Sequence, residues 1–341
     1  MAKLTISDIA RMANVSTATV SFVLNGRPGI CDETRSRVQA IIDETGYKPN
    51  VHTRRLTLRK SMTVHVVMRQ YQYTLFNFFS LEVLMGIFRE SRRLGYNIIF
   101  TSVDFTASDA RSNFDYVVDT VRTGDADGVI FIQTADPTVL TTLQNEHFPF
   151  LCVDSHVKKD GSIPLLEMDY YDASYRATQH LIDNGHTDIG FIGADAAMEY
   201  HLSTFGGYTA ALRDAGLVCH PEWVQIDAVE ESPLPGRLEN ILACKKRPTA
   251  VFCAGDIFAI DAIKCAKRAG LRIPEDMSFM SIDGLVVSDF IEPPLSTMAL
   301  DKAAMGANAM QLLYAIMNGQ PYEPVNLMKT HIVRRQTVRR L

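Results

Sequence analysis

Short apolar runs that alternate with amphipathic stretches are the feature that most constrains the fold of residues 62 to 341. Such runs are typical of buried strands in parallel sheets, and the stretches between them have the apolar spacing of helices. Strands are expected at 63–68, 97–100, 128–132, 150–153, 188–192, 250–253 and 278–282, and helices at 81–94, 173–184, 206–215, 257–269 and 302–317. The pattern predicts an α/β fold of doubly wound parallel sheets. Its length exceeds what one sheet usually holds, which predicts two lobes with a cleft between them.

Residues that directly follow the expected strands are candidate ligand contacts, because ligands of open parallel sheets bind beyond the carboxyl ends of the strands. These residues are Gln133, Asp154, Asp169, Ala194, Asp256 and Asp283. Each aspartate also has a second interpretation, as the cap of the helix that follows it.

The charge of the chain is divided unevenly. Residues 1 to 60 hold ten Lys and Arg against five Asp and Glu, whereas the whole chain holds 34 against 39, which leaves 24 bases and 34 acids for the remainder. A basic segment on an acidic body is typical of a protein that meets a polyanion at one end. A membrane surface or chance could produce the same imbalance.

Capping signals predict three short helices within the basic segment. Thr5 and Asp8 suit the start of a first helix, Ser16 caps a second that stops at Asn25-Gly26, and a third runs from about Asp32, as its cap, to Thr45 before Gly46. The residues expected to face inward from the first two helices and their turn are Ile6, Ile9, Ala10, Ala13, Val15, Val20 and Leu24.

The second of these helices presents Thr17, Ala18, Ser21 and Phe22 outward near its N-terminal end. In a helix-turn-helix this end enters the major groove of DNA, and a purely structural helical hairpin is the alternative. Beyond it, Tyr47-Lys48-Pro49-Asn50 blocks continuation of the third helix, and residues 51 to 60 form a basic linker with helical potential.

The sequence lacks the signals that are typical of several other classes of protein. The N-terminus has no apolar run before a cleavage site, and no stretch reaches the length of a membrane helix, so we expect a cytoplasmic protein without a membrane partner. The six cysteines show no paired spacing, and the histidines show no metal-ligand spacing. Asp154-Ser155-His156 lacks a GxSxG elbow, and glycine-rich nucleotide loops are missing. We therefore expect no catalytic residue, metal or cofactor. The arginine pairs near the end, Arg334-Arg335 and Arg339-Arg340, suggest a solvated tail.

The chain resembles the LacI family of bacterial transcription regulators over essentially its whole length. The resemblance is carried by TISDIARMANVSTATVSFVLNG from Thr5, by Tyr47-Lys48-Pro49-Asn50 with Arg54 and Leu56, and by later segments in family order. Those segments are 77–79, 93–97, 127–130, 184–190, 274–276, 282–283 and 293–297. The body is thereby similar to periplasmic sugar-binding proteins.

The resemblance implies roles for residues of the head and linker. Thr17, Ala18 and Phe22 match base-reading positions and offer apolar contacts to thymine, and Leu56 matches a wedge that enters the minor groove and bends the duplex. Thr53 replaces an alanine usual in this hinge. The predicted DNA-binding residues are Thr5, Ser16, Thr17, Ala18, Ser21, Phe22, Asn25, Asn50, Thr53, Arg54 and Leu56.

The resemblance also implies an effector site in the body, with two departures. The position of an effector-gripping arginine is Thr204, and Gly255 stands where asparagine is common. Without the guanidinium, a carboxylate or phosphate effector is not expected. The predicted effector-binding residues are Phe79, Thr204, Asp256 and Asp283, and a neutral sugar or polyol or no effector at all are the remaining choices.

The predicted protein is a dimeric operator-binding regulator, a repressor, with a helix-turn-helix domain at 1–46, a hinge helix at 47–61 and an effector-binding and dimerisation core at 62–341. We expect the N-lobe at 62–162 and 291–325 and the C-lobe at 163–290 and 326–341. Two alternatives stay open. One is a regulator that answers to a protein partner, and the other is a sugar-binding or glycoside-acting protein that uses Asp256 and Asp283.

Overall fold

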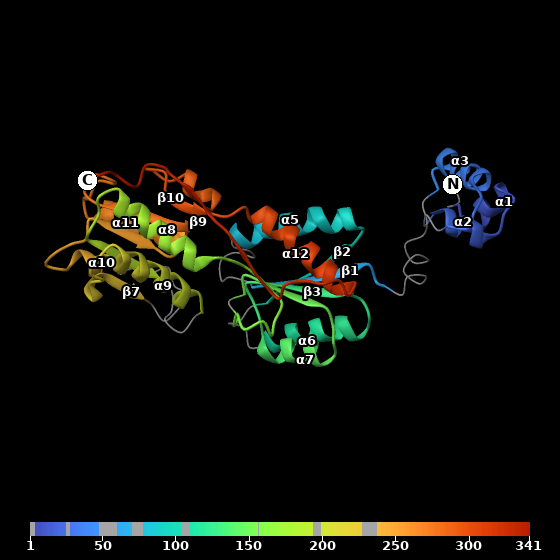
Figure 1. Cartoon of the computed structure of the whole chain (residues 1–341), viewed down its shortest axis with the longest axis horizontal. Coiled ribbons are helices and arrows are strands. Elements are labelled where there is room, and N and C mark those ends of the chain that lie inside the picture. Colours follow the sequence, from blue (N-terminus) through green and yellow to red (C-terminus); the bar gives the residue numbers. More distant parts are fainter. Residues whose placement is uncertain are drawn as a thin grey trace. The chain divides into compact units, whose positions relative to one another are not determined.

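The computed structural model describes residues 4–24, 28–47, 60–69, 78–103, 110–155, 157–193, 199–226 and 237–341, with the backbone alone at 110–113. The chain divides into two compact units, Met1–Met62 and Thr63–Leu341, which we call the head and the body (Figure 1). In the part of the chain that is described, no helix is both long and apolar enough to cross a membrane.

The head contains three helices whose ends follow from capping residues. They are α1 (Ile6–Met12), α2 (Thr17–Leu24) and α3 (Asp32–Thr45). Thr5 and Asp8 form a reciprocal capping box at the start of α1, and Ser16 Oγ accepts a hydrogen bond from the N–H of Thr19 at 3.1 Å. Gly46 ends α3 with a φ of 61°, which glycine adopts without strain. The prediction that Asp32 caps α3 is wrong, because Cys31 occupies the cap position and Asp32 lies in the first turn.

The core of the head confirms part of the set that was expected to face inward. Ile9, Ala10, Ala13 and Val20 are buried. Ile6, Val15 and Leu24 are half-buried and pack against this core, and Val23, which was not in the expected set, is buried. The buried cluster comprises Ile9, Ala10, Ala13, Val20, Val23, Val38, Ile42 and Tyr47.

The first lobe of the body is a six-stranded sheet in the order β11-β5-β4-β3-β1-β2, with parallel pairing throughout these strands. Figure 1 shows α5 and α12 on one face and α6 and α7 on the other. The elements are β1 (Thr63–Arg69), α5 (Phe78–Leu94), β2 (Asn97–Val103), α6 (Ala110–Arg122), β3 (Gly128–Ile132), α7 (Pro137–Asn145), β4 (Phe150–Val153), β5 (Leu165–Met168), α12 (Lys302–Met317) and β11 (Val325–Met328).

The second lobe repeats this architecture with the order β12-β10-β9-β8-β6-β7, in which only the β10–β12 pair is antiparallel among the described strands. The elements are α8 (Tyr170–Asp183), β6 (Ile189–Gly193), α9 (Glu199–Asp214), η1 (Pro221–Trp223), β7 (Val224–Ile226), α10 (Arg237–Leu242), β8 (Ala250–Cys253), α11 (Asp256–Arg268), β9 (Ser278–Asp283), η2 (Val286–Asp289), β10 (Ser296–Ala299) and β12 (His331–Val333). The prediction of two doubly wound parallel lobes is therefore confirmed.

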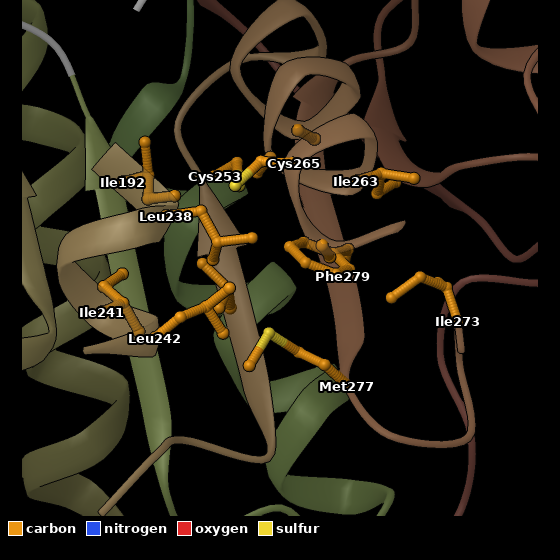
Figure 2. Close-up of a cluster of buried hydrophobic side chains, with 14 of the residues drawn as sticks. Ile192, Leu238, Ile241, Leu242, Cys253, Ile263, Cys265, Ile273, Met277 and Phe279 are labelled. Carbon is orange, nitrogen blue, oxygen red and sulfur yellow. The ribbon is translucent and has the colours of Figure 1, made fainter. Parts of the chain in front are cut away.

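Alternation along the strands builds a core on each face of the second sheet. Val251 and Cys253 of β8 face the cluster formed with α10 and α11, which Figure 2 shows around Leu238, Ile263 and Phe279. Phe252, between them, packs instead with Tyr208 of α9. β8 is thus buried on both sides, which accounts for its continuous apolar sequence.

The lobe boundaries differ from the predicted ones by six, nine and three residues. The strands β5 and β11 were assigned wholly or mostly to the C-lobe but belong to the first sheet, and β10 was assigned to the N-lobe but belongs to the second sheet. The chain crosses between lobes only after each strand is complete, because a strand must keep its ladder partners. The crossings follow Met168, Ala299 and Met328.

The C-terminal segment is not a solvated tail. Residues after β12 run along the second sheet, where the N–H of Phe279 donates to Thr337 O at 2.8 Å and the N–H of Leu341 donates to Asn184 O at 2.8 Å. Arg335 pairs with Asp289, its Nε lying 2.5 Å from Oδ1. The prediction overlooked these backbone partners.

Candidate functional site

The exposed surface of α2 holds most of the predicted DNA-binding residues that the structure describes. Thr17 and Ala18 are exposed, Ser21 is half-buried, and the Phe22 side chain keeps 37 % of its surface accessible. Part of the Phe22 side chain therefore faces solvent on the same side of α2 as Thr17 and Ala18. Thr5 and Ser16 are also exposed, and their hydroxyls serve the two helix caps.

Five predicted DNA-binding residues lie outside the described residues. They are Asn25, Asn50, Thr53, Arg54 and Leu56. Their roles stay predictions from sequence. Ala194, one of the residues that follow a strand, also lies outside the described part.

Asp256 is a structural centre of the second lobe rather than an open ligand. Its Oδ1 accepts hydrogen bonds from the hydroxyls of Ser281 and Thr297, both at 2.6 Å. Its Oδ2 accepts from the N–H of Leu285 and the hydroxyl of Ser288, both at 2.7 Å. A carboxylate offers about four acceptor positions, so these four donors use its capacity. The prediction that Asp256 contacts an effector, or acts with Asp283 as an acid/base pair, is therefore corrected.

Burial and hydrogen bonding act in opposite directions on Asp256. Burial raises the pKa of its carboxyl group, and the four donors oppose that rise. Such an arrangement holds the loop after β9 and the start of β10 against α11.

Thr204 is also withdrawn from the predicted set. It is fully buried on α9, and its hydroxyl donates to the carbonyl of Tyr200 at 3.0 Å, one turn back on the same helix. Threonine commonly makes this bond inside helices, which leaves the hydroxyl facing its own backbone. Gly255 is the second position at which the sequence departs from the family pattern. It precedes α11 with a φ of 149°, a conformation that glycine adopts readily.

Asp283 lies at the junction of the lobes, where Lys302 donates to its carbonyl, and the effector-binding roles of Asp283 and Phe79 stay predictions. Phe79 is buried in the first turn of α5, and Asp283 ends β9 with a φ of 113°, which is rare for a residue with a side chain. Burial raises the pKa of Asp283 well above its usual range, and the charges of Asp256 and Asp154 add to the rise, whereas Lys302 opposes it.

Lys302 is a buried cation at this junction that the sequence reasoning missed. It begins α12 in the first lobe, and its Nζ donates to the carbonyls of Asp283 at 2.9 Å and Gly284 at 2.8 Å in the second lobe. The carboxylate of Glu82 on α5 lies 3.6 Å away. A lysine in an amphipathic pattern gives no sequence signal for burial, because its partners are distant in the chain.

A second polar cluster at the junction contains residues that follow strands. Gln133, Asp154 and Tyr170 are joined by hydrogen bonds, with Asp154 fully buried. Gln133 and Asp154 follow β3 and β4 and so are candidate ligand contacts from sequence, but they are not among the predicted effector-binding residues. Asp169 proves to be the cap of α8, since its Oδ1 accepts from the N–H of Asp172 at 3.1 Å.

Metal-binding and disulfide chemistry find no support in the described part of the chain. No group of three or more His, Cys, Asp or Glu side chains is placed there to hold a metal ion. All six cysteines are free thiols, three of them buried.

Comparison with known proteins gives two family matches. Residues 5–50 match the bacterial regulatory proteins of the lacI family, and residues 178–338 match the periplasmic binding protein-like domain. The Ribose operon repressor of Haemophilus influenzae is 30 % identical, with 97 % of each chain covered. The HTH-type transcriptional repressor PurR of Vibrio campbellii is 29 % identical, with 99 % of each chain covered.

Solved structures share the fold at lower identity. The lac repressor dimer bound to operator and the anti-inducer ONPF superposes with a TM-score of 0.77 at 22 % identity, over 99 % of this chain and 100 % of that one. The complex of the transcriptional regulator CelR with cellobiose gives a TM-score of 0.72 at 24 % identity, over 98 % and 99 % of the two chains.

Proposed function

This chain belongs to the lacI family of bacterial regulatory proteins and is a DNA-binding transcription regulator, and we propose that it represses its target genes by binding a palindromic operator as a homodimer. The exposed face of α2 carries this proposal. Thr17, Ala18 and Phe22 place two small side chains and one ring where a recognition helix meets base edges. Their apolar contacts favour thymine methyl groups. The protein acts in the cytoplasm, where its DNA lies.

Dimer formation is supported by an apolar stripe on α5. Phe78, Leu81, Met85 and Phe88 recur at helical spacing, and each keeps 43 to 55 % of its surface accessible. Monomeric proteins seldom expose such a contiguous row. The occupant is a second copy of the chain, because one small head reads too few bases for selective binding and an isologous pair doubles the site.

The hinge residues complete the proposed operator complex. Leu56 and its symmetry mate enter the minor groove at the operator centre and unstack one base step, while Arg54 and Asn50 contact the backbone. Asn25 and Thr53 contribute further backbone contacts. Opening the step costs a few kcal/mol, which two hinge segments held together can offset.

The effector of the body is a neutral sugar or polyol that contacts Phe79 and Asp283. Relatives support this class, since one is named a ribose operon repressor and a structural neighbour holds cellobiose. At the position where the family has an effector-gripping arginine, this chain has the buried Thr204. No guanidinium group is therefore present there to bind an anion with two parallel hydrogen bonds.

Selection of binding sites from a random duplex library tests the proposal. The full chain is expected to recover a palindrome of about 14 to 20 base pairs with a deformable central step. Phe22→Ala should lose preference at one or two positions in each half-site, at a cost of about 1 to 3 kcal/mol per position. Met12→Ala removes an apolar side chain of α1 that is 51 % exposed and should select the wild-type site. Recovery of a non-palindromic site, or of the same site by Phe22→Ala, contradicts the proposal.

A further inference from the structure

A continuous hydrogen-bond chain connects the two lobes beside one of their crossings. Ser80 Oγ on α5 donates to Gln133 Oε1 at 2.7 Å, and Gln133 Nε2 donates to Asp154 Oδ2 at 3.0 Å. The other carboxylate oxygen of Asp154 accepts from the Tyr170 hydroxyl at 2.6 Å. The first three residues belong to the first lobe, whereas Tyr170 is the first residue of α8 in the second lobe.

The acceptor side of this contact is held rigidly. Gln133 and Asp154 have φ values of 51° and 50°, in the left-handed region that residues other than glycine seldom adopt. Such conformations cost free energy and persist where the surroundings determine them, which is common at functional sites. Since Ser80 occupies the carbonyl oxygen of the Gln133 side chain, its amide nitrogen is directed at Asp154.

The donor side is equally fixed. The Tyr170 ring is 2 % exposed and meets Tyr200 edge to face, with the ring centroids 4.7 Å apart. Tyr200 in turn donates its hydroxyl to the carbonyl of Ala254, so it cannot follow Tyr170 freely. Burial and the neighbouring Asp154 carboxylate raise the pKa of Tyr170 well above its usual range, which keeps the hydroxyl protonated and able to donate.

We propose that the hydrogen bond from Tyr170 to Asp154 is a hinge lock that holds the two lobes in this arrangement. Tyr170 directly follows the crossing at Asp169, so its hydroxyl fixes the direction in which α8 leaves the first lobe. A short hydrogen bond loses strength steeply when its partners separate or turn, and rotation of the second lobe would do both.

The hinge lock also restricts how an effector can act. Under the proposed function, a ligand that reaches Asp154 replaces the Tyr170 hydroxyl with a donor of its own, a hydroxyl or an amine. An effector without such a donor leaves the lock closed, because a buried carboxylate that loses one of its donors is costly.

Hydrogen exchange of the full-length protein tests the hinge lock with Tyr170→Phe, which removes one oxygen and keeps the ring. Tyr175→Phe is the matched control, since Tyr175 lies on the same helix and donates to Asp214 within the second lobe, at 3.3 Å. Tyr170→Phe should speed exchange about tenfold at Asp169 and the first turn of α8, as the loss of one hydrogen bond to a charged group implies. The Asp169 N–H reports directly, because it donates across the crossing to Met328 O.

Operator affinity supplies a second readout that rests on the proposed function. Faster exchange together with a change in operator Kd of about fivefold or more supports both the lock and its transmission to the head. Faster exchange with unchanged operator Kd supports the lock and contradicts transmission. Exchange in Tyr170→Phe that equals that of Tyr175→Phe overturns the hinge lock. In both variants Lys302, just after the crossing at Ala299, still connects the two lobes through the carbonyls of Asp283 and Gly284, so neither variant should unfold.

Discussion

Replacing Asp256 with alanine should destabilise the second lobe by about 3 kcal/mol. The change strands four donors, of which the hydroxyls of Ser281 and Thr297 can turn to the carbonyls of Ser296 and Met298, each 3.4 Å away. The N–H of Leu285 is fixed by its backbone, and Ser288 loses a 2.7 Å partner. An unsatisfied buried donor costs about 1 to 3 kcal/mol, and removal of a buried carboxylate returns part of the total.

Fluorescence of Trp223 during urea unfolding measures this change in the relevant lobe. Trp223 is the one tryptophan of the chain, is buried, and packs in the second lobe. A loss of about 3 kcal/mol corresponds to a midpoint lower by about 1.5 M urea for a slope near 2 kcal/mol/M. Glu275→Ala, which removes an exposed carboxylate before β9, should leave the midpoint unchanged. A shift below about 0.5 M for Asp256→Ala would refute the assignment and return Asp256 to the candidate ligands.

Two further predictions concern packing and pH. Gly207→Ala should destabilise the second lobe by about 1 to 3 kcal/mol, because the new Cβ would lie 2.3 Å from Tyr171 O on α8. Gly206→Ala is the control, since its Cβ would meet the Tyr171 ring at 3.5 Å, and it should gain up to about 1 kcal/mol of stability from helix propensity. Equal Trp223 unfolding midpoints for these variants would contradict the close crossing. Burial lowers the pKa of His65 to about 4, so His65 takes up a proton at a higher pH in the unfolded chain than in the folded one. The free energy of unfolding should therefore be about 2 kcal/mol smaller at pH 5 than at pH 8 through this residue. Unfolding at several pH values, followed by circular dichroism, should show that His65→Gln loses this part of the pH dependence and that His147→Asn, at an exposed histidine, keeps it. A pH dependence in His65→Gln equal to that of the wild type would disprove the contribution.

Elements with strong local signals could be predicted from the sequence, and elements defined by distant partners could not. The helix at 302–317 and the strand at 128–132 agree with the structure to the residue. The missed strand β5 contains the buried Glu167, whose charge is matched by Lys159 at 2.8 Å. A buried ion pair breaks the apolar pattern on which strand prediction depends. The missed β10, Ser296–Ala299, is short, and its Ser296 and Thr297 are buried because Asp256 and Thr337 supply partners.

The candidate sites divide in the same way. The exposed face of α2 follows from spacing within one helical hairpin, so Thr17, Ala18 and Phe22 could be placed by sequence alone. Contacts at the lobe junction depend on where side chains turn after each strand. Asp256 and Asp283 follow neighbouring strands, yet one is saturated by protein donors and the other retains the junction position. Tyr170 carried no signal, since its partner Asp154 approaches from the other lobe.

The charges at the junction of the lobes restrict the chemical class of the proposed effector further than Thr204 alone does. Among the described residues Lys302 is the cation placed there, but its Nζ already donates to the carbonyls of Asp283, Gly284 and, at 3.4 Å, Leu300, and Glu82 offsets its charge. An ammonium has three protons, so an anionic ligand would have to displace one of these carbonyls while approaching the carboxyl groups of Asp154 and Asp283. A neutral ligand with hydroxyl donors meets neither cost, and it can take over the acceptor that Tyr170 uses.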